Sequence, residues 1–377
     1  MIVTRLSSVL LSLLAGSCAY LFFLNRYLIE LEDRGRKFPV IAISLVATLI
    51  GSAVFGYAAA GTPWMIAPGV VLAATLLGEV RRVVIRRRCR GEPPVAQENT
   101  GTSLARPLTT TDLALTRYEI ACPGWGGPDL RIAHVSDFHA NHLLPVAYYE
   151  SAMERVAETQ PDLVFLTGDF VSKRESIPLL PRFLSLARGR LGTVAVLGNH
   201  DYWESGDDVA DAVRSAGVTW LGNGCLRFVL ADQAGQRVEE SPDGTPTQGS
   251  LDGATTQGSP LRVCGCEKPW APGEWHSPAA EAGELTLVLT HTPDNIYELS
   301  GTGIAAVFAG HYHAGQIRIP LLGSLVIPSA YGRLFDHGHF VVNGTHLFVT
   351  AGVGAAVPPF RVYCQPDVFI VDIRGSV

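Results

Sequence analysis

The chain has 377 residues, enough for one large domain or for a membrane anchor joined to a domain of ordinary size. Hydrophobic residues make up 47% and charged residues only 17%, and the apolar excess is concentrated near the N-terminus. The formal net charge of −6 gives no reason to expect a nucleic-acid partner.

Three apolar stretches open the chain, at residues 6–24, 38–61 and 63–80. Each approaches the ~20 residues that a helix needs to cross the hydrocarbon core of a bilayer. Residues 1–90 are therefore predicted to be a membrane anchor with about three transmembrane helices. A signal peptide or a lipoprotein site at Cys18 would explain the first stretch alone. A buried helical hairpin in place of one full span is the remaining alternative.

Basic residues mark one side of this anchor. Arg26, Arg34, Arg36 and Lys37 lie between the first two stretches, and six arginines lie in residues 81–90 after the third. Because the second and third stretches form a hairpin, both basic segments lie on the same side, which the positive-inside rule assigns to the cytoplasm. The sequence thus predicts a multi-pass protein of the cell (inner) membrane with its main domain in the cytoplasm. An exception to the rule would place that domain outside.

Beyond the anchor, residues 91–112 are rich in Pro, Thr, Gly and Gln and are predicted to link it to a domain at residues 113–377. Residues 232–260 have little apolar content, so they are predicted to be a disordered insertion within that domain. The seven cysteines are scattered and odd in number, which is not typical of a disulfide framework. Cys264 and Cys266 are interpreted as the buried end of a strand rather than as metal ligands.

The domain alternates short apolar runs with amphipathic helical stretches, which predicts an α/β fold. Five strand-like runs end in polar residues, where open sheets place their functional groups. The runs lie at residues 130–137, 161–169, 192–201, 284–294 and 304–313. The polar residues that close them are Asp137, His139, Asp169, Asn199, His200, Asp201, His291, His311 and His313.

These side chains predict a metal centre. Carboxylate oxygens and neutral imidazoles suit Mn, Fe and Zn, and no clustered set of thiolates suggests a structural zinc site. One metal would not use so many ligands, whereas two metals bridged by a carboxylate would. Such pairs stabilise both the attacking and the leaving oxygen of a displacement at phosphorus. We therefore expect two divalent or trivalent ions, with the choice among Mn, Fe and Zn left open.

The same blocks resemble the calcineurin-like metallophosphoesterase superfamily, whose pattern is D-x-H, G-D, G-N-H-[D/E], H and G-H-x-H in that order. In this chain they read DFH, GD, GNHD, LTHTPD and GHYH, from residue 137 to residue 313. The C-terminal residues resemble the branch that contains membrane-associated bacterial phosphoesterases. The resemblance implies a β-sandwich flanked by helices, in a four-layer α/β/β/α arrangement.

The resemblance also implies roles for these residues. Seven would bind the two metals: Asp137, His139 and His313 the first, Asn199, His291 and His311 the second, and Asp169 both. His200 would stabilise the phosphoryl oxygens or protonate the leaving group, and Asp201 would orient its ring. A metal-bridging hydroxide would be the nucleophile.

We therefore expect a membrane-anchored phosphohydrolase that cleaves a phosphodiester or pyrophosphate bond. Confining enzyme and substrate to one surface favours a lipid-linked substrate, and some relatives cleave UDP-2,3-diacylglucosamine. A non-catalytic membrane sensor or scaffold that binds a phospholigand on the same fold is the alternative. The sequence carries no information on the oligomeric state.

Overall fold

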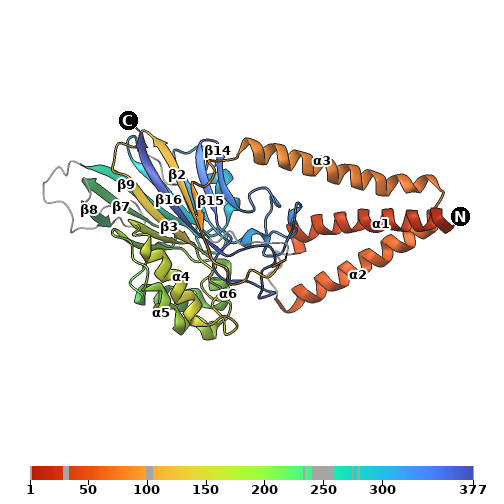
Figure 1. Cartoon of the computed structure of the whole chain (residues 1–377), viewed down its shortest axis with the longest axis horizontal. Helices are drawn as coiled ribbons and strands as arrows, with labels where there is room; N and C mark the ends of the chain where they lie inside the picture. Colours follow the sequence, from red (N-terminus) through yellow and green to blue (C-terminus); the bar gives the residue numbers. More distant parts are fainter. Residues whose placement is uncertain are drawn as a thin grey trace. The chain divides into compact units, whose positions relative to one another are not determined.

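The computed structural model describes residues 2–28, 34–98, 105–231, 234–239, 258–273, 275–277 and 281–376. The chain divides into two compact units (Figure 1). A helical unit contains Met1–Cys89 and Ser324–Phe335, and a sheet unit contains Arg90–Gly323 and Asp336–Val377.

Three long helices form the helical unit: α1 (Ile2–Phe23), α2 (Arg34–Ala58) and α3 (Ile66–Arg88). A π-helical turn (Leu24–Leu28) extends α1, and a 3₁₀ turn (Pro63–Met65) precedes α3. Three segments are long and apolar enough to cross a membrane, at Ile2–Tyr27, Arg36–Ala58 and Pro63–Arg88. They overlap the three apolar stretches of the sequence.

The helical unit also contains Ser324–Phe335, a segment that the sequence did not associate with the anchor. The Asn25 side chain donates to the Leu325 carbonyl oxygen at 3.0 Å and accepts from the Ile327 amide at 2.5 Å. Arg333 pairs with Glu79 of α3. Hydrogen bonds and an ion pair hold this segment in the helical unit. Such polar contacts produce no apolar periodicity, so the sequence did not predict them.

The sheet unit is built from two large sheets and one small hairpin. The first sheet contains β1 (Ala96–Glu98), β2 (Ala114–Pro123), β3 (Leu130–Val135), β4 (Leu163–Leu166), β5 (Gly192–Ala195), β6 (Thr219–Trp220) and β16 (Asp367–Ser376). The second contains β7 (Cys225–Ala231), β8 (Ala234–Glu239), β9 (Ser259–Cys266), β10 (Leu285–Thr290), β11 (Ala306–Ala309), β14 (Gly338–Val342) and β15 (Thr345–Val349). The hairpin pairs β12 (Arg318–Ile319) with β13 (Gly323–Ser324).

Parallel strands lie at the centre of each sheet. The strand orders are β1-β2-β16-β3-β4-β5-β6 and β14-β15-β11-β10-β9-β7-β8. The runs β3-β4-β5 and β9-β10-β11 are parallel, and β4, β10 and β11 are buried throughout, as expected for strands covered on both faces. Parallel strands bring their carboxyl ends to one edge, so the polar residues that follow them gather there.

Two apolar cores fix the layers (Figure 1). The helices α4 (Val146–Glu158), α5 (Leu180–Leu184) and α6 (Asn199–Ser215) pack on the first sheet through a core that includes Met153, Phe183 and Val213. A second core between the sheets includes Phe165, Phe308 and Phe348. The sequence's α/β prediction is therefore confirmed.

The expected fourth layer is thinner than predicted. Among the described residues, the helices after β10 and β11 are the one-turn α7 (Ile296–Leu299) and the 3₁₀ turns Pro293–Asn295 and His313–Gly315. A further 3₁₀ turn, Arg174–Leu179, precedes α5. The described layers are one layer of helices and two sheets, with short turns in place of a second full helical layer.

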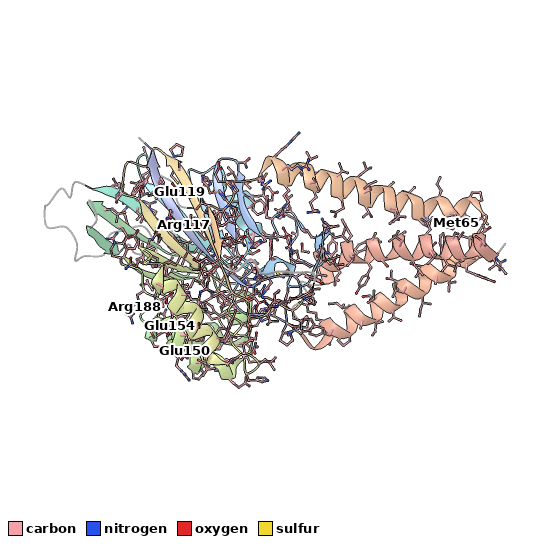
Figure 2. The ribbon with its side chains drawn as sticks, viewed as in Figure 1. Met65, Arg117, Glu119, Glu150, Glu154 and Arg188 are labelled. Atoms are coloured by element: carbon pink, nitrogen blue, oxygen red, sulfur yellow. A yellow bond between two sulfur atoms is a disulfide. The ribbon has the colours of Figure 1, made fainter. Side chains whose placement is uncertain are left out.

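The solvent-facing positions of β2 carry charged residues that pair with β16 (Figure 2). Arg117 binds Asp372 at 2.5 Å, and Glu119 binds Arg374 at 3.1 Å. Cross-strand pairs of opposite charge each contribute about 0.2–1 kcal/mol. They fix the register of the C-terminal strand beside β3, which carries the first site residues at its end.

Three features differ from the sequence expectations. The expected linker contains β1, which pairs antiparallel with β2. Within the expected insertion, β8 pairs with β7, and β9 begins at Ser259. Main-chain hydrogen bonds can form such strands without an apolar core. Residues 240–257 lie outside the described residues. Cys225 and Cys264 face each other on β7 and β9 and form a disulfide. Cys264 and Cys266 do end a buried strand.

Candidate metal centre

Four buried side chains from three strand ends converge on one point. Asp137 and His139 follow β3, Asp169 follows β4, and His313 follows β11. The Nε2 atoms of His139 and His313 are 3.0 Å apart. Asp169 Oδ2 lies 3.3 Å from His139 Nε2, and Asp137 Oδ1 lies 3.3 Å from His313 Nε2. These four donors could hold one metal ion.

A second group of donors shares an oxygen with the first. His291 follows β10, and its Nε2 lies 3.1 Å from Nδ1 of His311 and 3.2 Å from Oδ2 of Asp169. That oxygen is the one that also approaches His139. Asp169 therefore belongs to both donor groups.

Asn199 begins α6, next to the second group. A Cβ at the preceding Gly198 would lie 2.3 Å from Asp169 Oδ1 and 2.8 Å from His291 Cε1, so this backbone lies directly against both ligands. The Asn199 Oδ1 atom is buried and has no hydrogen-bond partner among the described residues. Buried polar atoms normally have one. An unpaired amide oxygen beside imidazole and carboxylate donors fits a bound divalent cation.

The backbone of this site is strained in a consistent way. Five of the donors have φ between 45° and 67°: Asp137, His139, Asp169, His311 and His313. Few residues other than glycine adopt positive φ, and such residues cluster at functional sites. Gly310 allows the loops to approach, because a Cβ there would lie 2.1 Å from Asp137 Oδ2.

Hydrogen bonds outside the cluster select which atom of each donor faces inward. His291 Nδ1 lies 2.6 Å from the Thr167 carbonyl oxygen, and His139 Nδ1 lies 3.0 Å from the Ser172 hydroxyl. Both rings then present Nε2 to the centre, as outer partners of metal-binding histidines commonly arrange. Asp169 accepts from the His200 amide at 2.8 Å through Oδ1, which leaves Oδ2 for bridging.

The charges of the centre interact strongly. Burial opposes ionisation of Asp169, but the adjacent His291 and His200 outweigh it and hold the pKa of this carboxyl well below its usual range. Burial lowers the pKa of His291, but Asp169 and Asp137 outweigh it and raise that pKa to about 9. Burial, followed by the neighbouring His139 and Arg361, lowers the pKa of His313 well below 6.5. A cation at Nε2 of His291 would take the place of a proton, so metal binding is linked to proton release.

His200 and Asp201, which the resemblance pairs, both lie in the first turn of α6. The His200 ring lies 4.6 Å from the ring of His139, centroid to centroid, beside the first donor group. The Asp201 carboxylate instead accepts backbone amides, from Phe170 at 2.8 Å and Gly198 at 2.9 Å. It joins the loop after β4 to the loop after β5, because its helical position points the carboxylate at these amides. That Asp201 also orients the His200 ring stays a prediction.

Three further residues lie near the site and were not among the residues that the sequence assigned to it. Arg361 is fully buried and donates to carbonyl oxygens of residues 351, 352 and 354 and of His313. Glu267 is a buried carboxylate that accepts from the Leu197 amide at 2.6 Å. The Trp270 ring lies 5.3 Å from that of His311. Glu267 follows an apolar run, so the pattern that found the other acidic residues also fits it; no pattern marks Trp270.

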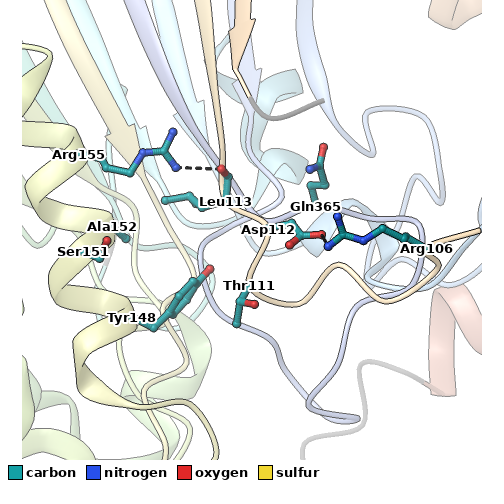
Figure 3. Close-up of a pocket in the computed structure, with 9 residues that line it drawn as sticks. All are labelled: Arg106, Thr111, Asp112, Leu113, Tyr148, Ser151, Ala152, Arg155 and Gln365. Carbon is teal, nitrogen blue, oxygen red and sulfur yellow. Dashed lines mark hydrogen bonds and ion pairs between the residues drawn. The ribbon is translucent and has the colours of Figure 1, made fainter. Parts of the chain in front are cut away.

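The structure also has a surface cavity of about 280 Å³ (Figure 3). Its lining includes Arg106, Asp112, Tyr148 and Arg155, and none of the seven predicted metal ligands. Arg155 donates to the Leu113 carbonyl oxygen at 2.9 Å.

Comparison with known proteins agrees with the motif order. Residues 130–315 match the calcineurin-like phosphoesterase family. The chain is 24% identical over 261 residues to the uncharacterized metallophosphoesterase YkuE of Bacillus subtilis, covering 67% of this chain and 81% of that protein. It is 26% identical over 264 residues to the phosphodiesterase YaeI of Escherichia coli, covering 69% and 87%. Over 215 residues it is 28% identical to the UDP-2,3-diacylglucosamine pyrophosphatase LpxG of Chlamydia trachomatis, covering 51% and 65%.

Proposed function

Because the chain contains a calcineurin-like metallophosphoesterase domain and is a hydrolase, we propose that it cleaves a phosphodiester or pyrophosphate bond with two metal ions. The observation that carries this proposal is the shared Oδ2 atom of Asp169, 3.3 Å from His139 Nε2 and 3.2 Å from His291 Nε2. One carboxylate oxygen within reach of two donor groups suits two ions.

The residues of the chain hold and orient the reacting groups. Asp137, His139 and His313 would bind the first ion, Asn199, His291 and His311 the second, and Asp169 both. Two such ions, which are Mn, Fe or Zn by donor type, supply Lewis acidity and an activated water nucleophile. Asp201 and Arg361 fix the loops that carry these ligands, through the backbone atoms that they bind.

His200 is the residue that we assign to proton transfer. Its ring stands against that of His139 at 4.6 Å, while its backbone amide is fixed by Asp169. From this position the imidazole can donate to a phosphoryl oxygen or protonate the leaving oxygen. Asp201 contributes by holding the loop, through the backbone amides of Phe170 and Gly198.

We further propose that α1, α2 and α3 anchor the enzyme in the cell membrane and that the substrate is a lipid-linked phosphate. The three helices are long and apolar enough to span a bilayer. Enzyme and lipid then share one surface, which raises their effective concentration. The likeness to LpxG supports UDP-2,3-diacylglucosamine as a first compound to test. The arginines of residues 81–90 favour a cytoplasmic domain.

The test uses the full-length protein in detergent micelles, with bis-p-nitrophenyl phosphate and UDP-2,3-diacylglucosamine as substrates. His200→Ala should lower kcat by about 10²–10⁴-fold, the usual contribution of a general acid, with the metal content unchanged. His276→Ala, at an exposed histidine, is the control and should retain activity. Saturable substrate binding without turnover by metal-loaded protein would instead indicate a sensor or scaffold.

A further inference from the structure

Two neighbouring loops of the sheet unit expose large apolar side chains. Leu321 and Leu322 form the tip between β12 and β13; Leu321 is fully exposed and Leu322 is 62% exposed. On the second loop, Val357 is 68% and Phe360 41% exposed. Gathered apolar side chains on a surface mark an interaction site, whereas single ones do not.

One glutamine joins the two loops. The Gln316 side chain donates to the carbonyl oxygens of Ala356, at 3.3 Å, and Pro358, and it accepts from the Ala356 amide at 2.8 Å. The Arg318 amide also donates to the Val362 carbonyl oxygen at 3.0 Å. The loops therefore share one hydrogen-bonded base and present their apolar residues as a fixed surface, here called the apolar rim (residues 319–322 and 356–360).

The base of the apolar rim is attached to the metal centre. The Gln316 amide donates to the His313 carbonyl oxygen at 2.8 Å. Arg361, which directly follows the rim, donates to the same carbonyl at 3.3 Å. A molecule held by the rim would therefore lie beside the donor groups that we assign to its phosphate.

The composition of the rim fits hydrocarbon rather than water or a charged partner. Residues 319–322 and 356–360 contain no charged side chain, and Pro320, Pro358 and Pro359 have no amide proton to satisfy. The Leu322 amide donates to Ile319 at 3.1 Å, and the Phe360 amide donates to Pro358 at 2.8 Å. Few backbone donors would thus be left unpaired in a bilayer, where each unpaired group costs several kcal/mol.

The chain leads from the rim into the membrane anchor. Gly323 is followed by Ser324–Phe335, which belongs to the helical unit. Within that unit, Asn25 binds Leu325 and Ile327, and Asn25 is followed by Arg26 in the π-helical turn that extends α1. Basic residues lie at the ends of transmembrane helices, near the head groups.

We propose that the apolar rim inserts into the lipid bilayer and contacts the acyl chains of the lipid whose phosphate enters the metal centre. This inference rests on the proposed function, since it names the part of the chain that selects a lipid-linked substrate. Leu321, with φ of 71°, presents its side chain from a backbone conformation that bulky residues rarely adopt.

Photo-crosslinking of the full-length protein in lipid nanodiscs tests the contact without requiring activity. Leu321→p-benzoylphenylalanine should yield protein carrying the mass of one phospholipid after irradiation. The same substitution at Leu186, an exposed leucine after α5, is the control and should yield no adduct. Crosslinks to a second copy of the chain, or no lipid adduct above the Leu186 level, would overturn the proposal.

Kinetics of the double variant Leu321→Asp, Leu322→Asp give a second readout. Turnover of bis-p-nitrophenyl phosphate should be unchanged, whereas KM for UDP-2,3-diacylglucosamine in mixed micelles should rise about tenfold or more. Unchanged KM for both substrates would contradict the rim's role. If the unmodified protein cleaves neither substrate, the proposed function fails, while the crosslinking result still decides whether the rim contacts lipid.

Discussion

Single residues carry the strain of the metal centre. Asp137, His139, Asp169, His311 and His313 all hold positive φ, at about 1–3 kcal/mol each for such conformations. The packing around these residues must offset this strain energy, and it brings the main chains of neighbouring loops close together. Residues without a side chain at those contacts are therefore as important as the donors.

Gly310 offers a direct test of this packing. In Gly310→Ala, the new Cβ would lie 2.0 Å from Ser136 Oγ and 2.1 Å from Asp137 Oδ2, so the loop with His311 and His313 must shift. We expect the variant to lose at least one metal equivalent by elemental analysis and to melt at a lower temperature. Gly126→Ala, where nothing lies within 4 Å, should change neither quantity. Normal metal content in Gly310→Ala would contradict the close approach.

His134 shows how a buried residue makes stability depend on pH. Its ring is fully buried in β3, where Nε2 lies 2.9 Å from the Thr167 hydroxyl, and burial lowers its pKa to about 3. In the unfolded chain His134 binds a proton as the pH falls through 6.5, whereas in the native chain it does so only near pH 3. The contribution of His134 to the free energy of unfolding is therefore complete above pH 6.5 and is lost as the pH falls toward 3. Between pH 7 and pH 5 the loss should be about 2 kcal/mol. Urea unfolding of His134→Gln should show a correspondingly flatter pH dependence; equal slopes would contradict this assignment.

At the scale of elements, strand ends were predictable and loop interactions were not. Each apolar run that ends in Asp137, Asp169 or His291 is a real strand end, because parallel buried strands leave an unmistakable apolar run followed by polar residues. The Asp201 contacts depend on which amides the loops turn inward, and no residue pattern records that. The disulfide of Cys225 and Cys264 depends on the register of β7 and β9 across 39 residues, which the cysteine spacing does not reveal.

Glu267 connects the two sheets where the metal ligands begin. It directly follows β9, is fully buried, and accepts from the Leu197 amide and Trp220 Nε1, both at 2.6 Å, and from the Tyr202 hydroxyl. Leu197 immediately precedes Gly198 and Asn199. The carboxylate thereby sets the position of the loop that carries Asn199.

In Glu267→Gln, one of the two carboxylate oxygens is replaced by an amide NH2 group, which cannot accept the hydrogen bonds that Glu267 receives from Leu197, Trp220 and Tyr202. We expect the affinity of the second metal to fall about 10–100-fold, the usual effect of losing an outer hydrogen-bond partner. Calorimetric titration with Mn²⁺ measures this directly. Glu154→Gln, at an exposed position of α4 (Figure 2), is the matched control and should bind as the unmodified protein does. Equal affinities for all three proteins would show that Glu267 does not position the loop.

For the whole molecule, two features favour opposite sides of the membrane. The arginines after the third helix favour a cytoplasmic domain, whereas a disulfide between Cys225 and Cys264 is typical of oxidising compartments. We expect the arginines to decide, because orientation is set during insertion, before the domain folds. A C-terminal green fluorescent protein fusion should then fluoresce. The cytoplasm should keep Cys225 and Cys264 reduced, so both thiols should react with N-ethylmaleimide once acid-quenched cells are denatured. An active C-terminal alkaline phosphatase fusion, with both cysteines held in the disulfide, would instead show that the domain lies on the other side of the membrane.

The two-metal centre is tested most directly by counting metals while measuring turnover. Chelator-stripped full-length protein is titrated with Mn²⁺, and bound metal and hydrolysis of bis-p-nitrophenyl phosphate are measured on the same samples. We predict two equivalents per chain, with turnover appearing as the second binds, and loss of both metals and activity in Asp169→Asn. Full turnover at one equivalent or none, or an Asp169→Asn variant that keeps both metals and full activity, would contradict a bridged pair.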